Sequence, residues 1–219
     1  MTRLRRELAR RCFPGSGAYW EARYRSEGTS GRGSYGRLAE FKAEVLNSFV
    51  ASREVRSVIE LGCGDGNQLS LARYPRYVGL DVSTRAIELC EARFRSDETK
   101  SFFVYDPLHF VNRRGALSAE LALSLDVIYH LVEEATFQRH LRHLFGVATR
   151  FVAIYSSNSE LIEPNSQPHV RHRRFSSWID DSLPEWELDV MIPNRYSTST
   201  DPSGSASDFY FYRRRAPSP

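Results

Sequence analysis

The sequence predicts an α/β domain with a doubly wound, mostly parallel sheet of seven strands that ends in a C-terminal antiparallel strand pair. Three observations predict it. Short apolar runs rich in β-branched residues alternate along the chain with segments of helical periodicity. A cluster of glycines directly follows the first of these runs, as in open α/β sheets that bind a ligand. The last two runs have no helical pattern between them, which is typical of antiparallel strands joined by a long loop.

The individual elements follow from this pattern. The expected parallel strands are 57–61, 77–81, 101–105, 121–125 and 151–155, and the terminal pair is 186–192 and 209–212. The expected helices are 18–24, 38–51, 66–73, 83–94 and 131–145. Ser83 is a good N-cap for its helix, and Glu133 and Glu134 lie near the start of the last helix, where the helix dipole favours negative charge.

The composition fits a globular chain. Of the 219 residues, 41% are hydrophobic and 26% are charged, and no apolar run approaches the ~20 residues that span a bilayer. Three cysteines without paired spacing favour a reducing compartment and argue against a zinc site. The formal net charge of +3 is too small to make nucleic acid the leading partner. We therefore expect a cytoplasmic protein without membrane contact, either a monomer or a homodimer.

Residues 1–36 are predicted to form an N-terminal arm, and residues 37–219 the single domain that the arm covers. Six of the 13 glycines lie in this arm, where they break regular structure. Aromatic residues, among them Trp20, Tyr24 and Tyr35, are interleaved with these glycines. The combination indicates a lid over a ligand site, and a disordered leader is the alternative.

The segment ELGCGDG, residues 60–66, ends the first strand and opens the first expected helix. An open α/β sheet binds its ligand at this place, and glycines let the backbone pass close to that ligand. Asp81 ends the next strand 19 residues after Gly62, close to the offset at which a carboxylate reaches a ribose diol. These two features together predict a nucleoside site.

The residues of the same segment indicate which class of nucleoside would bind there. A dinucleotide fingerprint needs its third glycine at position 67, where this chain has Asn67, and no Gly-Lys-Ser/Thr follows as in a phosphate-binding loop. Glu60 and Asp65 are poor neighbours for a pyrophosphate and good ones for a cationic amino-acid nucleoside. The sequence therefore favours a zwitterionic ligand over a phosphorylated one.

Three runs in this chain, VIELGCGDG, GLDVS and SLDVIYHL, resemble the first, second and fourth motifs of the class I S-adenosylmethionine-dependent methyltransferases. The strand order with its closing antiparallel pair is similar as well, and the resemblance covers roughly residues 55–212. It implies the Rossmann-like methyltransferase fold and S-adenosyl-L-methionine as the cofactor. The motifs are specific for the fold and the cofactor, but they give almost no information about the methyl acceptor.

The resemblance assigns the glycine segment to the methionine portion of the cofactor. Gly62 and Gly64 would contact that portion directly, with Glu60 as a neighbour that orders the loop. Cys63 lies inside the loop and invites a nucleophile interpretation, but no histidine is near it in the sequence. A small side chain packed against the nucleoside is the better interpretation of Cys63.

The remaining cofactor contacts come from the ends of later strands. By resemblance, Asp81 would accept hydrogen bonds from both ribose hydroxyls, and Val82 would pack on the adenine. Asp106 would lie beside the adenine amino group, although an Asp-Pro turn is the structural alternative. Leu125 would supply backbone contacts near the sulfonium.

Aromatic residues of the arm fit the same ligand, because ring faces tolerate a sulfonium cation. Tyr24 and Tyr35 are therefore expected beside the cofactor, together with Trp20.

Catalysis is expected just beyond the fourth strand, where the reacting methyl group should project. His130 is the candidate general base, since its ordinary pKa lies near neutrality, and Tyr129 is its candidate partner. The run SLDVIYHL resembles a C-M-E-V-x-E-H-V segment of O-methyltransferases whose glutamates and histidine can hold a metal. Asp126 and Tyr129 replace those glutamates here, so no metal is predicted. The alternative is a histidine that only caps or packs against the following helix.

Acceptor contacts are expected after the fifth strand, in QPHVRHRRFSSW. His169, Arg171 and His172 are the candidates, and the arginine would suit an acceptor with an anionic group. An ordinary basic loop is the alternative. His140 and His143 share a helix face without a third ligand nearby, which predicts a solvated face rather than a metal site.

These observations favour a methyltransferase that moves a methyl group from S-adenosyl-L-methionine to an oxygen or nitrogen of a small molecule, such as a sugar, a nucleotide or a natural-product intermediate. Three alternatives stay open. They are a nicotinamide oxidoreductase on a similar sheet, a nucleic-acid methyltransferase suggested by the arginine clusters, and a non-catalytic module that binds the cofactor.

Overall fold

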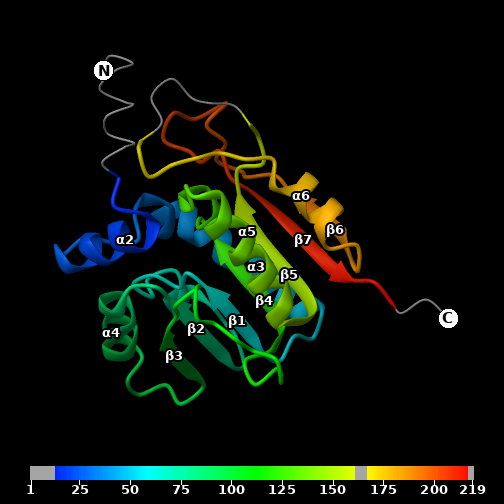
Figure 1. Cartoon of the computed structure of the whole chain (residues 1–219), viewed down its shortest axis with the longest axis horizontal. Helices are drawn as coiled ribbons and strands as arrows, with labels where there is room; N and C mark the ends of the chain where they lie inside the picture. Colours follow the sequence, from blue (N-terminus) through cyan, green and yellow to red (C-terminus); the bar gives the residue numbers. More distant parts are fainter. Residues whose placement is uncertain (1–12, 161–166, 217–219) are drawn as a thin grey trace.

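The computed structural model describes residues 13–160 and 167–216, and a seven-stranded sheet runs through its centre (Figure 1). The strands are β1 Val58–Leu61, β2 Tyr77–Asp81, β3 Lys100–Val104, β4 Ala119–Leu125, β5 Ala148–Ser156, β6 Trp186–Ile192 and β7 Asp208–Arg214. Their order in the sheet is β3-β2-β1-β4-β5-β7-β6. Strands β1 to β5 are parallel, whereas β7 is antiparallel to both of its neighbours. The predicted fold class is confirmed.

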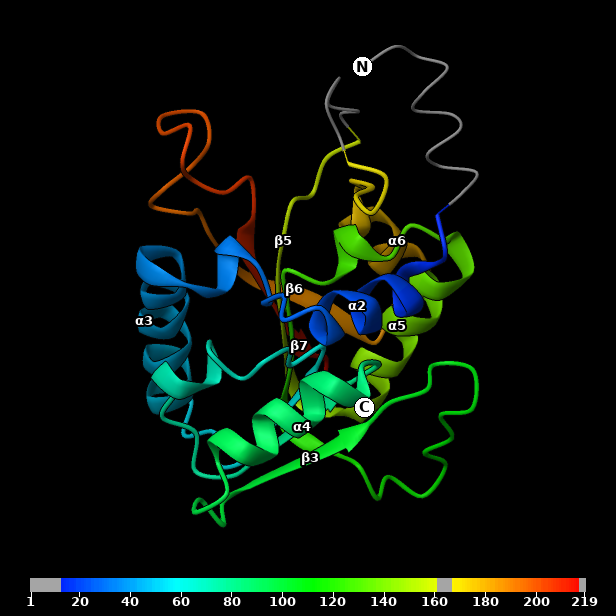
Figure 2. The same ribbon diagram turned by 90° about the vertical axis from the view of Figure 1, so that its left-hand side faces the viewer.

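Helices cover both faces of this sheet, as a parallel sheet requires. They are α2 Ser16–Arg25, α3 Gly36–Ser52, α4 Thr84–Arg93, α5 Glu134–Val147 and α6 Phe175–Ser182, with 3-10 turns η1 Arg32–Ser34, η2 Leu69–Leu71 and η3 Ile128–His130. Figure 2 shows α3 and α5 on opposite sides of the sheet, with α2 between them across one end. No helix among the described residues is long and apolar enough to span a bilayer.

Two apolar cores lie on either side of the sheet. On the α3 side, Leu46 and Phe49 pack with Leu121 and Leu123 of β4. On the α5 side, Leu141 and its neighbours pack against the alternate strand residues, including Ala122 of β4. Successive strand residues point to opposite faces, so the continuous apolar run of β4 serves both cores.

The helix expected at 66–73 is wrong in the structure, which has only the turn η2 there. Gly66 has a φ of 74°, outside the right-handed helical region, and Ala72 is already extended with φ −84° and ψ 148°, so only a short turn fits between them. The helix expected from 131 begins instead at Glu134, because η3 and Leu131 intervene. Helix α6 was not predicted, although Phe175, Trp178 and Ile179 recur at helical spacing.

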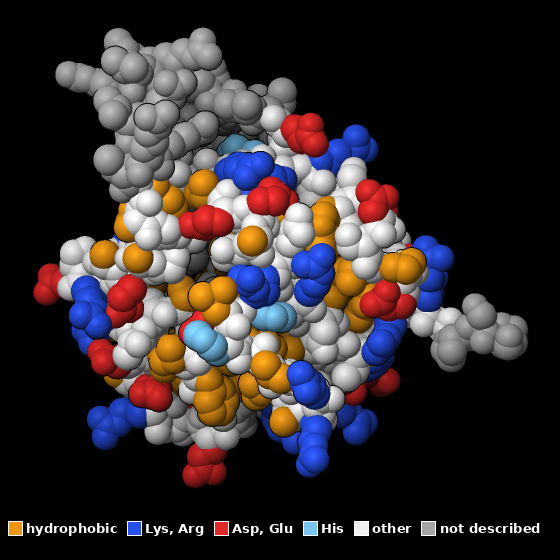
Figure 3. Space-filling view, viewed as in Figure 1, with side chains coloured by type: hydrophobic (Ala, Val, Ile, Leu, Met, Phe, Trp, Pro, Cys, Tyr) orange, Lys and Arg blue, Asp and Glu red, His pale blue; other side chains and the backbone are white. Residues whose placement is uncertain are grey.

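The surface carries paired rather than segregated charges. Arg195 Nη2 lies 2.8 Å from Glu44 Oε1, and Arg213 Nη2 lies 2.6 Å from Glu187 Oε1. On the face drawn in Figure 3, acidic and basic side chains are interspersed. Arg213 and Arg215, near the C-terminal end, thus both pair with Glu187 at the surface.

Candidate functional site: a cavity at the carboxyl ends of the parallel strands

A cavity of about 560 Å³ lies where β1, β2 and β4 end, with α2 as its roof. Its volume is typical of a small-molecule site. Its two ends differ in composition. The β2 end is formed by Asp81, Val82 and Asp106, and the α3 end by Lys42, Glu60, Gln68 and Asp126. The cavity lies at the place that the sequence predicts for a nucleoside.

The glycine segment forms the floor of the cavity, and its backbone conformation explains two of its glycines. Gly62 has a φ of 92°, and a Cβ there would lie 2.5 Å from Val127 Cγ2. Gly64 has a φ of 60°, and a Cβ there would clash with Ser30 Oγ of the arm. Any side chain at either position would strain the backbone and displace a neighbour. The two glycines therefore allow Val127 and the arm to pack directly against the loop.

Asp81 is fixed by the backbone on both sides. Its Oδ2 accepts from the Gly64 N–H and its Oδ1 from the Ser83 N–H, each at 2.9 Å. Burial raises the pKa of Asp81 to about 6, although these N–H donors oppose the shift. The carboxylate is thereby held between the glycine segment and the start of α4, and it lines the cavity.

Glu60 is also buried at the cavity wall, on the α3 side of β1. Burial raises its pKa to about 7, although the hydroxyl of Tyr77, which donates to Glu60 Oε2 at 2.6 Å, acts in the opposite direction. A carboxyl group with this pKa changes charge near neutral pH, so it responds to a cation placed beside it.

The other predicted cofactor residues are placed unequally. Val82, Cys63, Leu125 and Tyr24 line the cavity, as does Asp106, whose pKa is lowered by the hydrogen bond from His109. A hydrogen bond with Cys90, together with burial, raises the pKa of Cys63, so its thiol stays protonated and unreactive.

Tyr35 does not line the cavity. Its hydroxyl donates to Asp65 Oδ2 at 2.8 Å, and the Ser30 N–H donates to the same oxygen at 2.9 Å. Asp65 therefore fastens the arm to the glycine segment. The structure places Tyr35 in the support of the site rather than in its lining.

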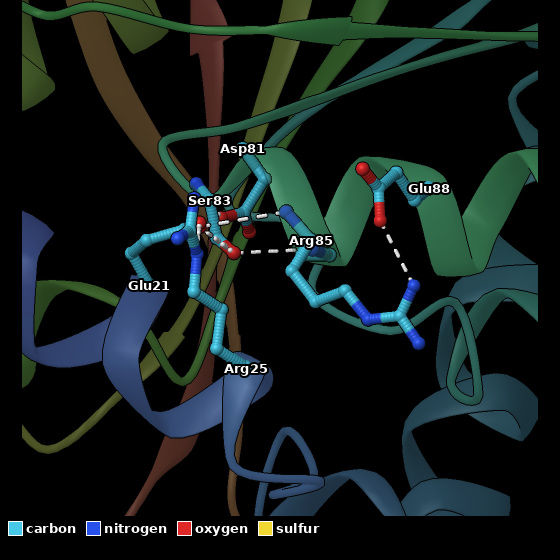
Figure 4. A network of polar contacts seen from close by, with 7 residues as sticks. Glu21, Arg25, Asp81, Ser83, Arg85 and Glu88 are labelled. Atoms are coloured by element: carbon cyan, nitrogen blue, oxygen red, sulfur yellow. Dashed lines mark hydrogen bonds and ion pairs between the residues drawn. The ribbon is translucent and has the colours of Figure 1, made fainter.

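Helix α2 of the arm is attached on both sides of the cavity. At its N-terminus, the Ser16 N–H and hydroxyl donate to Glu133 at 2.9 and 2.7 Å. Further along, Glu21 Oε2 accepts from the Ser83 hydroxyl at 2.6 Å, beside Asp81 and Arg85 (Figure 4). The described part of the arm, from residue 13 onward, is thus an ordered roof, and residues 1–12 lie outside the described residues.

His130 lines the cavity beyond β4 and is held by two segments. Its Nδ1 lies 3.1 Å from the His169 carbonyl oxygen, which can only accept, so Nδ1 carries the hydrogen and Nε2 is the free acceptor. Trp20 of the roof packs edge-on against its ring at 4.9 Å. Burial lowers the pKa of His130 to about 4, which keeps the ring neutral at pH 7.

The remaining candidate residues for catalysis and acceptor binding do not line the cavity and lie behind His130. The Tyr129 hydroxyl donates to Asp126 Oδ1 at 3.0 Å, and its residue is not part of the cavity lining. His169 stacks on His130, and Arg171 pairs with Glu134 at 3.3 Å. His172 Nδ1 lies 2.6 Å from Ser157 Oγ.

Two further histidines differ from the prediction of a solvated face. His140 is only 4% exposed, and its Nε2 lies 2.9 Å from Ser124 Oγ. His143 is half-buried against Tyr105. The face of α5 that carries them packs on the sheet, and the buried Ser124 supplies the polar partner that His140 needs. Among the described residues, no three metal-binding side chains converge.

Sequence reasoning missed Lys42 and Gln68 at the α3 end of the cavity. Lys42 is fully buried, and its Nζ lies 2.7 Å from Asp126 Oδ2. A signal was available, because Leu38, Lys42 and Leu46 recur every four residues and therefore share the core-facing stripe of α3. A lysine in such a stripe is exceptional unless it has a partner. Asp126, with a φ of 58°, is itself in a left-handed conformation that non-glycine residues rarely adopt.

Comparisons with known proteins give structural neighbours only. No family model and no curated protein sequence matches the chain. Among solved structures, the N-methyltransferase NodS from Bradyrhizobium japonicum WM9, in complex with S-adenosyl-L-homocysteine, matches with a TM-score of 0.68 at 18% identity, over 93% of this chain and 100% of that one. The magnesium protoporphyrin IX methyltransferase ChlM from Synechocystis PCC 6803 matches with a TM-score of 0.61 at 14% identity, over 95% and 99%. The methyltransferase domain of bacterial CtHen1 matches with a TM-score of 0.64 at 18% identity, over 81% and 100%.

Proposed function

Since this chain has the fold of the class I S-adenosylmethionine-dependent methyltransferases, we propose that it binds S-adenosyl-L-methionine in the cavity and transfers its methyl group to an oxygen or nitrogen of a small molecule. The observation that carries the proposal is the junction of the glycine segment with Asp81. A side-chain-free floor and a buried, fixed carboxylate meet in one cavity, as a nucleoside with a diol requires.

The residues present fit this cofactor. Val82 offers an apolar surface for a base at the β2 end, with Asp106 at the rim as a hydrogen-bond acceptor. Trp20 and Tyr24 of the roof offer aromatic faces toward a sulfonium, and Glu60 offers a carboxyl group. Tyr35 contributes by holding the loop through Asp65.

The cofactor supplies a methyl group on a positively charged sulfur, and the protein supplies geometry and a proton acceptor. The walls of the cavity restrict the relative positions of the reacting groups, which is the main contribution that a displacement of this kind needs. His130 Nε2 accepts the proton that an acceptor hydroxyl or ammonium loses. With a pKa of about 4 it is a weak base, so this proton leaves during the transfer and not before it.

The loop after β5 is the proposed acceptor-binding segment, with His169, Arg171 and His172 as its candidates and Tyr129 beneath it. It adjoins the base directly, because the His169 carbonyl orients His130 and the Arg171 N–H donates to the Tyr129 carbonyl at 2.8 Å. Interspersed surface charges favour a small molecule over nucleic acid, since a nucleic-acid site needs a continuous basic stripe.

Ligand binding and then turnover test the proposal. We expect S-adenosyl-L-homocysteine to raise the melting temperature of the purified chain, because a ligand of the folded state alone stabilises it, whereas NAD should not. A rise with NAD alone would contradict the proposal. Binding without methyl transfer to any member of a broad panel of sugars, nucleotides and natural-product intermediates would favour a non-catalytic module, and steeply salt-dependent RNA binding would favour a nucleic-acid acceptor.

A further inference from the structure

One face of α2 is directed at His130. Ser16, Tyr19 and Trp20 are spaced at i, i+3 and i+4, so they share one side of the helix. Ser16 Oγ lies 2.8 Å from the carbonyl oxygen of His130, and the Trp20 ring packs edge-on against its imidazole at 4.9 Å. Tyr19 reaches His130 through His169. All three side chains of this face therefore bear on the candidate base.

Three rings form a stack beside the cavity. The Tyr19 ring lies 4.4 Å from that of His169, with the two planes 14° apart. The His169 ring in turn lies 5.4 Å from that of His130, with the planes 18° apart. His169 is thus held between a ring of the arm and the candidate base. Because stacked rings lose contact when one of them turns away, the side chain of Tyr19 restricts the position of His169.

The backbone of His169 determines which nitrogen of His130 carries the hydrogen. His130 Nδ1 lies 3.1 Å from the His169 carbonyl oxygen, which can only accept, so the hydrogen stays on Nδ1. Among the described residues, neither ring nitrogen of His130 has another hydrogen-bond partner. The tautomer therefore depends on this one contact. If the carbonyl moved away, the hydrogen could move to Nε2, which would then donate instead of accepting a proton.

The segment that carries this carbonyl has few other attachments. Beyond His169, the Arg171 N–H donates to the Tyr129 carbonyl at 2.8 Å. Within the described residues, His169 itself forms one hydrogen bond, to His130, and its ring stacks only on Tyr19 and His130. The stack on Tyr19 is thus the contact that ties His169 to the arm.

On the basis of the proposed function, we propose that Tyr19 is a positioning residue, whose stack on His169 keeps the His169 carbonyl at His130 Nδ1 and so keeps Nε2 as the proton acceptor. Trp20 and His130 line the cavity but Tyr19 does not, so this role is separate from ligand binding. The arm then does more than cover the site. Only a chain whose α2 is in place carries the tautomer that can take a proton.

The tautomer of each histidine can be read directly. A two-bond ¹H–¹⁵N correlation spectrum of the full chain at pH 7, without cofactor, distinguishes a hydrogen on Nδ1 from one on Nε2. His130→Gln assigns the signal of His130 among the six histidines. His130 is neutral at this pH, because burial lowers its pKa to about 4. We expect the hydrogen on Nδ1 in the wild type.

Three substitutions at Tyr19 test the stack. Tyr19→Ala removes it, and Tyr19→Leu removes it while keeping an apolar side chain that supports the fold. In both variants we expect the main population of His130 to shift to the form with the hydrogen on Nε2, which an imidazole in water favours. Tyr19→Phe should keep the wild-type tautomer, since it keeps the ring and the Tyr19 hydroxyl has no hydrogen-bond partner among the described residues.

Two measurements separate this role from a general loss of stability. Tyr196→Ala is the matched control, because Tyr196 is also a half-buried tyrosine that packs against a ring, that of Phe41 at 6.4 Å, but lies in the loop after β6. Its His130 signal should match the wild type. The affinity of Tyr19→Ala for S-adenosyl-L-homocysteine should stay within about threefold of the wild type, whereas kcat with any acceptor found in the panel above should fall roughly tenfold or more.

A hydrogen on Nε2 in the wild type would overturn the inference. So would a folded Tyr19→Ala or Tyr19→Leu variant that keeps the hydrogen on Nδ1, or an equal shift in Tyr196→Ala. An unchanged kcat despite a shifted tautomer would overturn it as well, because the tautomer would then not matter to the transfer. Since the tautomer is read without a cofactor, failure of S-adenosyl-L-homocysteine to bind the wild type would contradict the proposed function alone.

Discussion

The β2 end and the α3 end of the cavity are built in different ways. At the β2 end, Asp81 is held by backbone N–H groups of its own turn and of the glycine segment. At the α3 end, Lys42 lies on a helix and Asp126 directly follows β4, 84 residues further along the sequence, and the two hold one another through their side chains. The first arrangement is local and visible as a motif, whereas the second depends on tertiary packing.

The largest effect should come from Asp81→Asn at the β2 end. The substitution removes the charge from an acceptor that would serve two ribose hydroxyls, so affinity for S-adenosyl-L-homocysteine should fall roughly a hundredfold or more in calorimetry. Asp106→Asn is the comparison, with a smaller loss, because Asp106 is exposed to solvent. Equal losses for the two variants would mean that the β2 end does not dominate binding.

Gly62→Ala should show how much the floor depends on its backbone conformation. The φ of 92° and the contact with Val127 should together destabilise the fold by roughly 1–3 kcal/mol. Gly146→Ala in α5 is the control, since a Cβ there meets nothing within 4 Å and alanine favours a helix by up to ~1 kcal/mol. Urea unfolding measures both, and a stable Gly62→Ala variant would contradict the structure.

Glu60→Gln should change how the free energy of unfolding depends on pH, because Glu60 is a buried titratable group at the α3 end. The pKa of Glu60 is raised by burial from 4.5 to about 7, so its protonated form stabilises the fold fully below pH 4.5 and this contribution is lost as pH rises through 7. Glutamine does not titrate, so the variant does not lose this stability. As pH rises from 5 to 8, the free energy of unfolding of the wild type should therefore fall relative to that of the variant, by at most about 3 kcal/mol. Parallel pH profiles for the two chains would show that Glu60 does not titrate in this range.

Arg171→Ala should have the smallest effect on cofactor binding. Arg171 lies outside both ends of the cavity and pairs with Glu134 at the surface, where such pairs contribute little. We expect the dissociation constant for S-adenosyl-L-homocysteine to change by less than about twofold. A larger change would place the loop after β5 in contact with the cofactor.

The sequence predicted most of the sheet because its strands are short apolar runs between clear turns. It also predicted Gly62, Gly64, Asp81 and Val82 as cavity residues, since all of them lie at strand ends whose positions follow from the pattern.

It could not predict which side chains face the cavity across elements. Tyr35 and Tyr129 are turned toward Asp65 and Asp126, and such contacts depend on the packing of the arm and of η3. No helix forms at 66–73 because the loop, and not the hydrophobic spacing, determines the backbone conformations of Gly66 and Ala72.

The hydrogen bonds that attach α2 to Glu133 and to Ser83 affect how fast a ligand enters and leaves the cavity. Each fastening uses the N-terminal end of another helix, α5 or α4, so the roof can lift only when one of these helix ends gives up its contact. Breaking these contacts would widen the opening of the cavity. Variants at Ser16 or Ser83 would therefore change how fast a ligand enters and leaves, apart from any change in how the floor binds it.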